Sequence, residues 1–230
     1  SVALPAAHCQ QLLQAYDDVH IAAVNSPHIT VVAGNADALA RLVSTCNEDG
    51  IRARRIDVDY ASHTPHVDAL RDHLLDQLAD VTPQSGHTQF FSTVTRQIID
   101  TTTLDANYWF GNLRNRVRFH ESVDALIARG VKVLLLTPLT ADALTPAANR
   151  AKNAKIPVIT LDRAVNGEVN QHIGADNKLI GAKAAEYVAK TVLGGKPGKI
   201  IEIQGVLGAS ATTDRHNEFK AWLDKNAPEV

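Results

Sequence analysis

The sequence has no methionine, only two cysteines and few aromatic residues, which make up 5% of the chain. Two cysteines cannot build a disulfide framework, and neither Cys9 nor Cys46 has the spacing of a zinc site. We therefore expect both thiols to be reduced and half-buried, packed as small hydrophobic side chains. A chain that lacks methionine, the initiator included, is expected to be processed, excised from a longer protein or assembled from parts.

Long apolar runs and a surplus of basic charge are also absent. No stretch approaches the roughly 20 apolar residues of a membrane helix, and no basic-then-apolar leader opens the chain. The net charge is -2 and the pI is near 6.5, which argues against a nucleic-acid-binding protein with a basic face. With 45% hydrophobic and 21% charged residues, the composition is that of a globular protein that buries a core.

The charged residues divide unevenly along the chain. Residues 1–130 contain 10 Arg, no Lys and 15 acidic residues, whereas residues 131–230 contain 10 Lys, 3 Arg and 10 acidic residues. Eight of the ten histidines and both cysteines lie in the first part. Chance combined with a surface charge gradient is one interpretation. The alternative, which the motifs below favour, is that the two parts differ in origin.

The first part predicts two successive arrangements of secondary structure. Residues 1–64 follow the order strand, helix, strand, strand, helix, strand, which is typical of a ferredoxin-like subdomain. The expected strands are 1–4, 20–24, 29–32 and 51–58, and the expected helices are 6–16 and 36–46, the second with Asn35 as its N-cap. Residues 65–130 then predict a helix to about residue 81, a strand at 90–94 and a helix at 119–128.

The second part alternates between strand and helix. The expected strands are 131–136, 157–161, 172–175 and 199–204, and the expected helices are 141–153, 179–192 and 214–225. This alternation predicts a partial Rossmann-like, parallel α/β sheet. The fold class expected for the whole chain is therefore α/β, with an α+β N-terminal part.

Four motifs within residues 1–130 form an ordered series that resembles the acyltransferase domain of modular polyketide synthases. They are Ala22-Ala23-Val24-Asn25-Ser26-Pro27, Arg54-Arg55-Ile56-Asp57-Val58-Asp59-Tyr60-Ala61-Ser62-His63, Phe91-Ser92-Thr93-Val94-Thr95 and Tyr108-Trp109-Phe110-Gly111-Asn112-Leu113-Arg114. In that family a ferredoxin-like subdomain sits on an α/β-hydrolase-like one. The resemblance implies that residues 1–64 are the first and residues 65–130 a part of the second.

The resemblance also implies a role for each of four residues. His63 would be the general base of a Ser–His pair, because an imidazole within hydrogen-bond reach activates a serine hydroxyl. Tyr60 and Ser62 would shape the pocket for the extender unit. The motif Tyr-Ala-Ser-His, in place of His-Ala-Phe-His, goes with methylmalonyl-CoA rather than malonyl-CoA. A backbone carbonyl near Asn112 would orient the imidazole.

Two features depart from the family pattern. The nucleophile motif Gly-His-Ser-x-Gly does not occur, and the nearest string, Gly208-Ala209-Ser210-Ala211-Thr212, lacks its last glycine. Arg116 stands where proline is usual. By composition alone, a lone histidine such as His63 is more often structural than catalytic.

Four motifs within residues 122–230 resemble ribose-type periplasmic sugar-binding proteins. They are Val131-Lys132-Val133-Leu134-Leu135-Leu136-Thr137-Pro138, Ile156-Pro157-Val158-Ile159-Thr160-Leu161-Asp162-Arg163, His172-Ile173-Gly174-Ala175-Asp176-Asn177 and Lys199-Ile200-Ile201-Glu202-Ile203-Gln204-Gly205. In that family two Rossmann-like lobes close on a sugar across a three-segment hinge. The resemblance implies that residues 131–230 form part of such a lobe arrangement.

By this resemblance Asp162 and Arg163 match the sugar-binding Asp-Arg pair, and Arg215 matches an arginine offered from the other lobe. A carboxylate that accepts hydroxyl hydrogen bonds beside a forked guanidinium donor suits a polyol. Thr137 and Ala175 stand where ribose binders often have Asn and Ser, which argues against ribose itself. The alternative for Asp162 and Arg163 is a surface ion pair.

Taken together, the motifs indicate a composite chain with a seam near residues 121–131 and with no complete active site. Two alternatives remain open: an acyltransferase fragment that works with a partner supplying the nucleophile, and a sugar-binding module of an ABC transporter. No metal or other cofactor is expected. Acyl-CoA or an acyl carrier protein would be the partner of the first part and a monosaccharide that of the second. The expected location is cytoplasmic for the first resemblance and periplasmic for the second.

Three weaker patterns have ordinary explanations. His63, His66 and His73 do not have HExxH spacing, so we expect the latter two to be solvated helix positions rather than metal ligands. The loop from Gly205 to Gly208 lacks the Gly-Lys-Ser/Thr of a phosphate loop. Asp17 and Asp18 are expected to form a charged loop.

Overall fold

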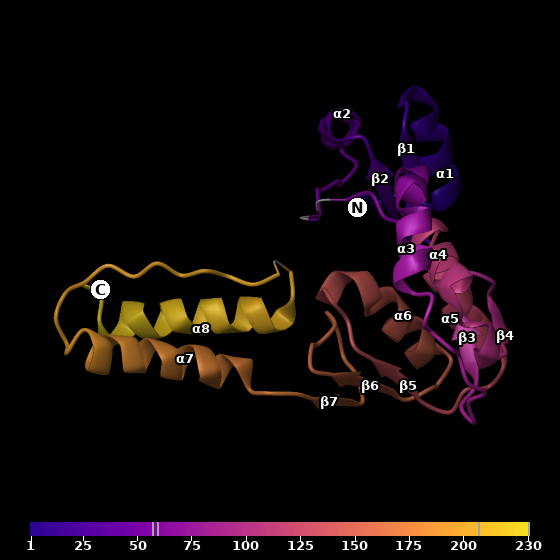
Figure 1. Ribbon diagram of the computed structural model, residues 1–230. Helices are drawn as coiled ribbons and strands as arrows, with labels where there is room; N and C mark the ends of the chain where they lie inside the picture. The colour runs from indigo at the N-terminus through magenta and orange to yellow at the C-terminus, as the bar shows by residue number, and fades with distance from the viewer. Residues whose placement is uncertain (57, 59, 207, 230) are drawn as a thin grey trace. The chain divides into compact units, whose positions relative to one another are not determined.

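The computed structural model describes residues 1–56, 58, 60–206 and 208–229, and it divides into two compact units, Ser1–Gly130 and Val131–Val230 (Figure 1). The expected α/β class is confirmed, because helices alternate with strands and the second unit contains a parallel sheet. In the described part of the chain, no helix has both the length and the apolar character needed to cross a bilayer.

The first unit contains short helices and two antiparallel strand pairs. Its elements in chain order are α1 (Ala6–Leu12), η1 (Leu13–Ala15), β1 (Val19–Ser26), β2 (Ile29–Gly34), α2 (Ala36–Glu48), η2 (Pro65–Leu70), α3 (Arg71–Gln77), β3 (Phe90–Ser92), β4 (Gln97–Ile99), η3 (Thr101–Thr103), α4 (Ala106–Arg114) and α5 (Phe119–Ala128).

The core of this unit lies where α1 and α2 pack against β1 and β2. Leu42 and the two thiols of Cys9 and Cys46 are at most 1% exposed, so the cysteines are fully buried rather than half-buried. The turn Ser26 to Ile29 closes the β1–β2 hairpin. Asn35 begins α2 as expected, because its side-chain oxygen accepts hydrogen bonds from two backbone N–H groups of the first helical turn.

The two outer strands expected for residues 1–4 and 51–58 shorten to single bridges. Val2 pairs antiparallel with Thr30 on one side and with Ala53 on the other. Asp57 and Asp59 lie outside the described residues. The antiparallel order is therefore Ala53, Val2, β2, β1, but only the inner hairpin has the length of a strand. A strand persists only where several consecutive residues pair with a neighbouring strand. Here Val2 forms one bridge to Thr30 and one to Ala53.

Residues 90–114 contain three elements that periodicity did not predict, β4, η3 and α4. The expected strand at 90–94 is β3, which pairs antiparallel with β4 in a short hairpin. The helix α4 follows, with Asp105 as N-cap accepting from the Tyr108 N–H. Its aromatic residues conceal the helical period because they spread around the helix rather than along one face.

The second unit contains a parallel three-stranded sheet and a helical hairpin. Its elements are β5 (Leu134–Leu136), α6 (Ala141–Asn153), β6 (Val158–Leu161), β7 (Gln171–Ile173), α7 (Asn177–Tyr187), η4 (Val188–Val192) and α8 (Ser210–Asn226). The sheet order is β5-β6-β7, with both neighbouring pairs parallel. This agrees with the expected parallel sheet, although it has three strands and not four.

The strand expected at residues 199–204 does not form. The segment runs as an extended chain beside α8 (Figure 1), where Glu202 and Gln204 contact His216 at 2.6 and 2.8 Å. Ile201 and Ile203 point away and are 91% and 93% exposed. Among the described residues, no backbone hydrogen bond involves residues 199–204. The apolar pattern favours a strand, but a strand needs a neighbour to pair with.

Candidate functional site

His63 is held at the end of a tight turn by two hydrogen bonds, one to the last turn of α4 and one to Asn115, the residue that follows this helix. Its backbone N–H donates to the Leu113 carbonyl at 2.8 Å, and its ring Nδ1 lies 2.9 Å from the Asn115 carbonyl oxygen. Its φ of +63° is in the left-handed region, which costs a non-glycine residue free energy that surrounding contacts must offset. Such backbone strain is concentrated at functional sites.

The partner of Nδ1 fixes the tautomer of the His63 imidazole. A carbonyl oxygen only accepts hydrogen bonds, so Nδ1 must carry the proton of the neutral ring. The lone pair then resides on Nε2. This is the tautomer that a general base requires, with one nitrogen anchored to the protein and the other able to take a proton.

A backbone carbonyl was expected near Asn112, and the carbonyl that lies beside the His63 Nδ1 is that of Asn115, three residues further on. Asn112 lies in the last turn of α4, where carbonyls point along the helix axis. Asn115 ends the helix with extended dihedrals (φ -90°, ψ 153°), which turn its carbonyl out of the helix. Its own side chain donates to the Gly111 carbonyl at 2.7 Å and fastens it to the last turn.

A cavity of about 730 Å³ in the first unit brings together Tyr60, Ser62 and His63. Its wall is largely aliphatic and comes from β1, β2, α2 and the segment before Tyr60. Among the lining residues are Val31, Leu39, Val43, Ile56, Arg54 and Arg55. The volume is within the range of small-molecule sites, and an apolar wall with a few polar groups is their usual composition.

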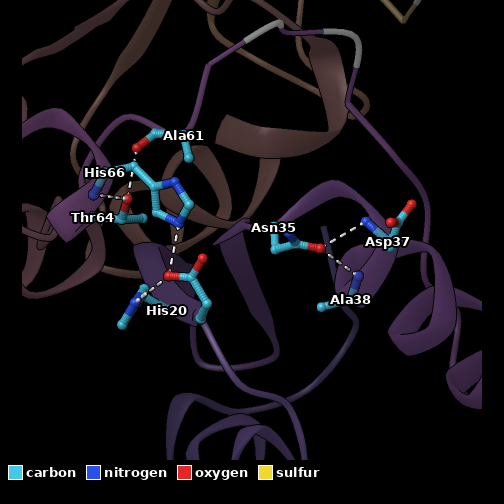
Figure 2. A network of polar contacts seen from close by, with 8 residues as sticks. His20, Asn35, Asp37, Ala38, Ala61, Thr64 and His66 are labelled. Carbon is cyan, nitrogen blue, oxygen red and sulfur yellow. Dashed lines mark hydrogen bonds and ion pairs between the residues drawn. The ribbon is translucent and has the colours of Figure 1, made fainter.

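A second set of polar contacts lies beside His63 and was not expected from the sequence. His66 and His20 both point toward the Asp18 carboxylate (Figure 2), with Nε2 atoms 2.8 and 3.7 Å from Oδ1. The buried Thr64 hydroxyl donates to the Ala61 carbonyl at 2.7 Å and accepts from the His66 N–H. The sequence pattern did not indicate these contacts, because Asp18 and His66 are 48 residues apart in the chain.

In the second unit, Asp162 and Arg163 directly follow β6, at the carboxyl end of a parallel strand. That edge is where α/β sheets bind ligands. Asp162 has a φ of +63°, and its N–H donates to the Ile173 carbonyl at 2.9 Å. The Arg163 Nε lies 3.8 Å from the Asp162 Oδ2, so the two side chains form a loose ion pair. The carboxylate is 67% exposed.

Arg215 is directed elsewhere. It lies on α8, and its Nε donates to the Asn177 side-chain oxygen at 2.9 Å, across the contact between α7 and α8. Within the described ranges, no hydrogen bond or ion pair joins Arg215 to Asp162 or Arg163. The beginning of α8 does reach the β6 end, because Ser210 Oγ accepts from the Ala164 N–H at 2.9 Å.

The residues proposed as weak metal candidates are dispersed. Among the residues that the structure describes, no group of three or more His, Cys, Asp or Glu side chains is arranged to hold a metal ion. His63 and His66 face different partners, and His73 is exposed on α3. In the loop from Gly205 to Gly208, Leu207 lies outside the described residues.

Comparison with protein families gives two matches that overlap in the middle of the chain. A family model described as an acyl transferase domain matches residues 1–138. A family model described as a periplasmic binding protein domain matches residues 79–230. The shared stretch includes α5 and Gly130, the expected seam.

The similar proteins agree with the first match. Polyketide synthase GfsE of Streptomyces halstedii is 50% identical over 136 residues, which is 59% of this chain and 4% of GfsE. Erythronolide synthase EryA2 of Saccharopolyspora erythraea is 37% identical over 163 residues, 69% of this chain and 5% of that protein. A solved acyltransferase domain from module 8 of the salinomycin polyketide synthase is 36% identical with a TM-score of 0.62, over 75% of this chain and 39% of that one.

Proposed function

Because residues 1–138 belong to the acyl transferase domain family and residues 79–230 to the periplasmic binding protein domain family, we propose that this is a composite chain whose first unit contributes half of an acyl-transfer site. That half consists of the base His63 and the acyl-selecting wall around Tyr60 and Ser62. The observation that carries the proposal is that His63, with Nδ1 committed to Asn115, lines the same cavity as Tyr60 and Ser62.

The nucleophile of the proposed reaction comes from outside these 230 residues. A serine hydroxyl supplied by a partner would give its proton to the His63 Nε2 and attack the thioester carbonyl of an acyl-CoA. Collapse of the tetrahedral intermediate expels the CoA sulfur, which takes the proton back from the imidazolium. The acyl ester on serine then passes to an acyl carrier protein thiol. No metal or other cofactor enters these steps.

Methylmalonyl-CoA is the proposed substrate, on the strength of the Tyr60-Ala61-Ser62-His63 motif. Tyr60 and Ser62 line the cavity on either side of Ala61, so a change at both positions alters the wall beside the base. The replacement pair Tyr60→His and Ser62→Phe recreates the malonyl-type motif. It is expected to shift the preference toward malonyl-CoA without loss of His63.

The test uses the full chain mixed with a separate fragment that carries a Gly-His-Ser-x-Gly segment, together with methylmalonyl-CoA. Intact mass spectrometry should show an acyl adduct on the fragment's serine, absent with His63→Ala and retained with His73→Ala, the exposed control. An unmodified mass for wild type contradicts the proposal. An adduct that survives His63→Ala contradicts the role of His63.

For the second unit we propose monosaccharide binding at the carboxyl end of β6. The left-handed backbone of Asp162, with an exposed carboxylate beside Arg163, favours this second candidate. A ligand at a hundredfold excess over its Kd stabilises the folded state by about 2.7 kcal/mol. Thermal melts across a pentose and hexose panel should therefore show a rise that Asp162→Asn removes. Melting curves that stay flat across the panel refute sugar binding.

A further inference from the structure

Asp18, at the end of the segment before β1, reaches the turn that carries His63. Its Oδ1 is 2.8 Å from the His66 Nε2, and because a carboxylate only accepts hydrogen bonds, Nε2 carries a proton there. The Asp18 backbone is itself fixed: its carbonyl accepts from the Asn35 N–H at 3.0 Å, next to the N-terminus of α2. Asp18 is therefore a rigid point on the hairpin unit, not a loose charged loop.

His66 connects Asp18 to the turn that contains His63. Its backbone N–H donates to the Thr64 hydroxyl, which in turn donates to the Ala61 carbonyl. Thr64 is fully buried, and its hydroxyl lies between the Ala61 carbonyl and the His66 N–H (Figure 2). His63, with its left-handed backbone, directly precedes Thr64. A displacement of His66 therefore acts on Thr64, which directly follows His63, and through it on Ala61, two residues before His63.

The opposite side of the same turn is attached to α4 and the residue after it. The Leu113 and Asn115 carbonyls bind His63 itself, and the Arg114 Nε donates to the Asp68 carboxylate at 2.6 Å. The helix η2, which contains His66 and Asp68, thus connects Asp18 on one side with α4 on the other. His63, a strained residue between these two attachments, keeps its conformation only while the hydrogen bonds on both sides are formed.

We infer that Asp18 is a positioning residue for His63, acting through its hydrogen bond to His66. The catalytic meaning of this inference rests on the proposed function. The positioning of the His63 ring through Asp18 and His66 does not depend on it. Loss of the Asp18 contact frees His66 and loosens the turn. The Nδ1–H group of His63 then no longer keeps its hydrogen bond to the Asn115 carbonyl, and the base nitrogen is no longer fixed as Nε2.

The experiment measures the ring ¹⁵N shifts of the full chain labelled at histidine, with His63 assigned by the signal lost in His63→Gln. Wild type should show one protonated Nδ1 and one unprotonated Nε2. In Asp18→Ala and His66→Leu, which remove the acceptor and the donor of this bond, the two shifts should converge as exchange between tautomers begins. Asp17→Ala, at an exposed neighbour outside this network, should keep the wild-type pattern.

The His66→Gln variant decides the case if Asp18→Ala fails to fold, because a glutamine amide still donates to Asp18. It should restore the wild-type His63 pattern that His66→Leu loses. A wild-type pattern in both Asp18→Ala and His66→Leu overturns the inference, even if acyl transfer occurs. Converging shifts with no acyl adduct in wild type support the positioning role and refute the proposed function instead.

Discussion

The His63 ring and the Asn115 backbone are joined by a 2.9 Å hydrogen bond, although 52 residues separate them in the chain. The bond selects the tautomer that leaves Nε2 as a base. It exists because α4 ends just before Asn115 and turns that carbonyl outward. Orientation of the candidate base therefore depends on where a helix stops.

Replacement of Asn115 by alanine is expected to disturb His63, whereas replacement of Asn112 is not. The Asn115 amide holds the last turn of α4 through Gly111, and the loss of one such bond costs about 1 kcal/mol. Urea unfolding followed by Trp109 fluorescence, in a Trp222→Phe background, measures the change. A larger effect from Asn112→Ala would contradict the assignment of Asn115.

The two cysteines should be unreactive in the native protein. Both are buried, and burial raises the pKa of the Cys9 thiol to about 11 from an ordinary 9.0. Iodoacetamide at neutral pH should label neither Cys9 nor Cys46 until denaturant is added, as mass spectrometry will report. Labelling of the native chain at the unfolded rate would show that this core opens.

The same shift makes stability depend on alkaline pH. Since the folded state favours the protonated thiol, its contribution is fully present below pH 9 and is lost as the pH rises toward 11. Wild type should therefore lose stability between pH 9 and 11 more steeply than Cys9→Ala. If stability falls with pH equally steeply in the two proteins, the Cys9 thiol has the same pKa in the folded and the unfolded state.

Gly181→Ala should destabilise the second unit, against the helix propensity of alanine. A Cβ at Gly181 would overlap the backbone carbonyl oxygen of Arg215 on α8, so α7 and α8 would be forced apart. Overpacking costs about 1–3 kcal/mol, more than the roughly 1 kcal/mol that alanine gains within a helix. Trp222 fluorescence in a Trp109→Phe background follows unfolding.

The matched control is Lys178→Ala, at an exposed position on α7. Its effect should stay within about 0.5 kcal/mol. If Gly181→Ala proves as stable as wild type, the close approach of α7 and α8 is wrong. The position of Arg215 would then be in question too, because Gly181 packs on its backbone.

Trypsin should cut first after Lys199. The segment 199–204 is extended and exposed, and its backbone has no hydrogen-bond partner among the described residues. Pro197 protects the bond after Lys196. Mass spectrometry of a brief digest should show a fragment that begins at Ile200, lost in Lys199→Gln and kept in Lys178→Gln. Early cleavage within α7 instead would contradict an unpaired segment.

Local patterns predicted the elements that are stabilised within themselves. The helix at 141–153 follows from the helical period of its apolar residues. The cap at Asn35 follows from one side chain that bonds to the first turn of the helix it begins. The expected strand at 199–204 was wrong, since its apolar pattern is met by no neighbouring strand. Asp18 was expected to be a plain charged residue, because nothing near it in the chain indicates His66.

The sequence by itself determined the two family resemblances, the α/β class and the residues Tyr60, Ser62 and His63 as members of one motif. Tertiary structure decided which carbonyl orients His63, that Arg215 turns to Asn177 and that Asp18 reaches His66. The physical reason is the range of the forces involved. Period, capping and turn preference act over a few residues, whereas a hydrogen bond between distant residues exists only after the chain has packed.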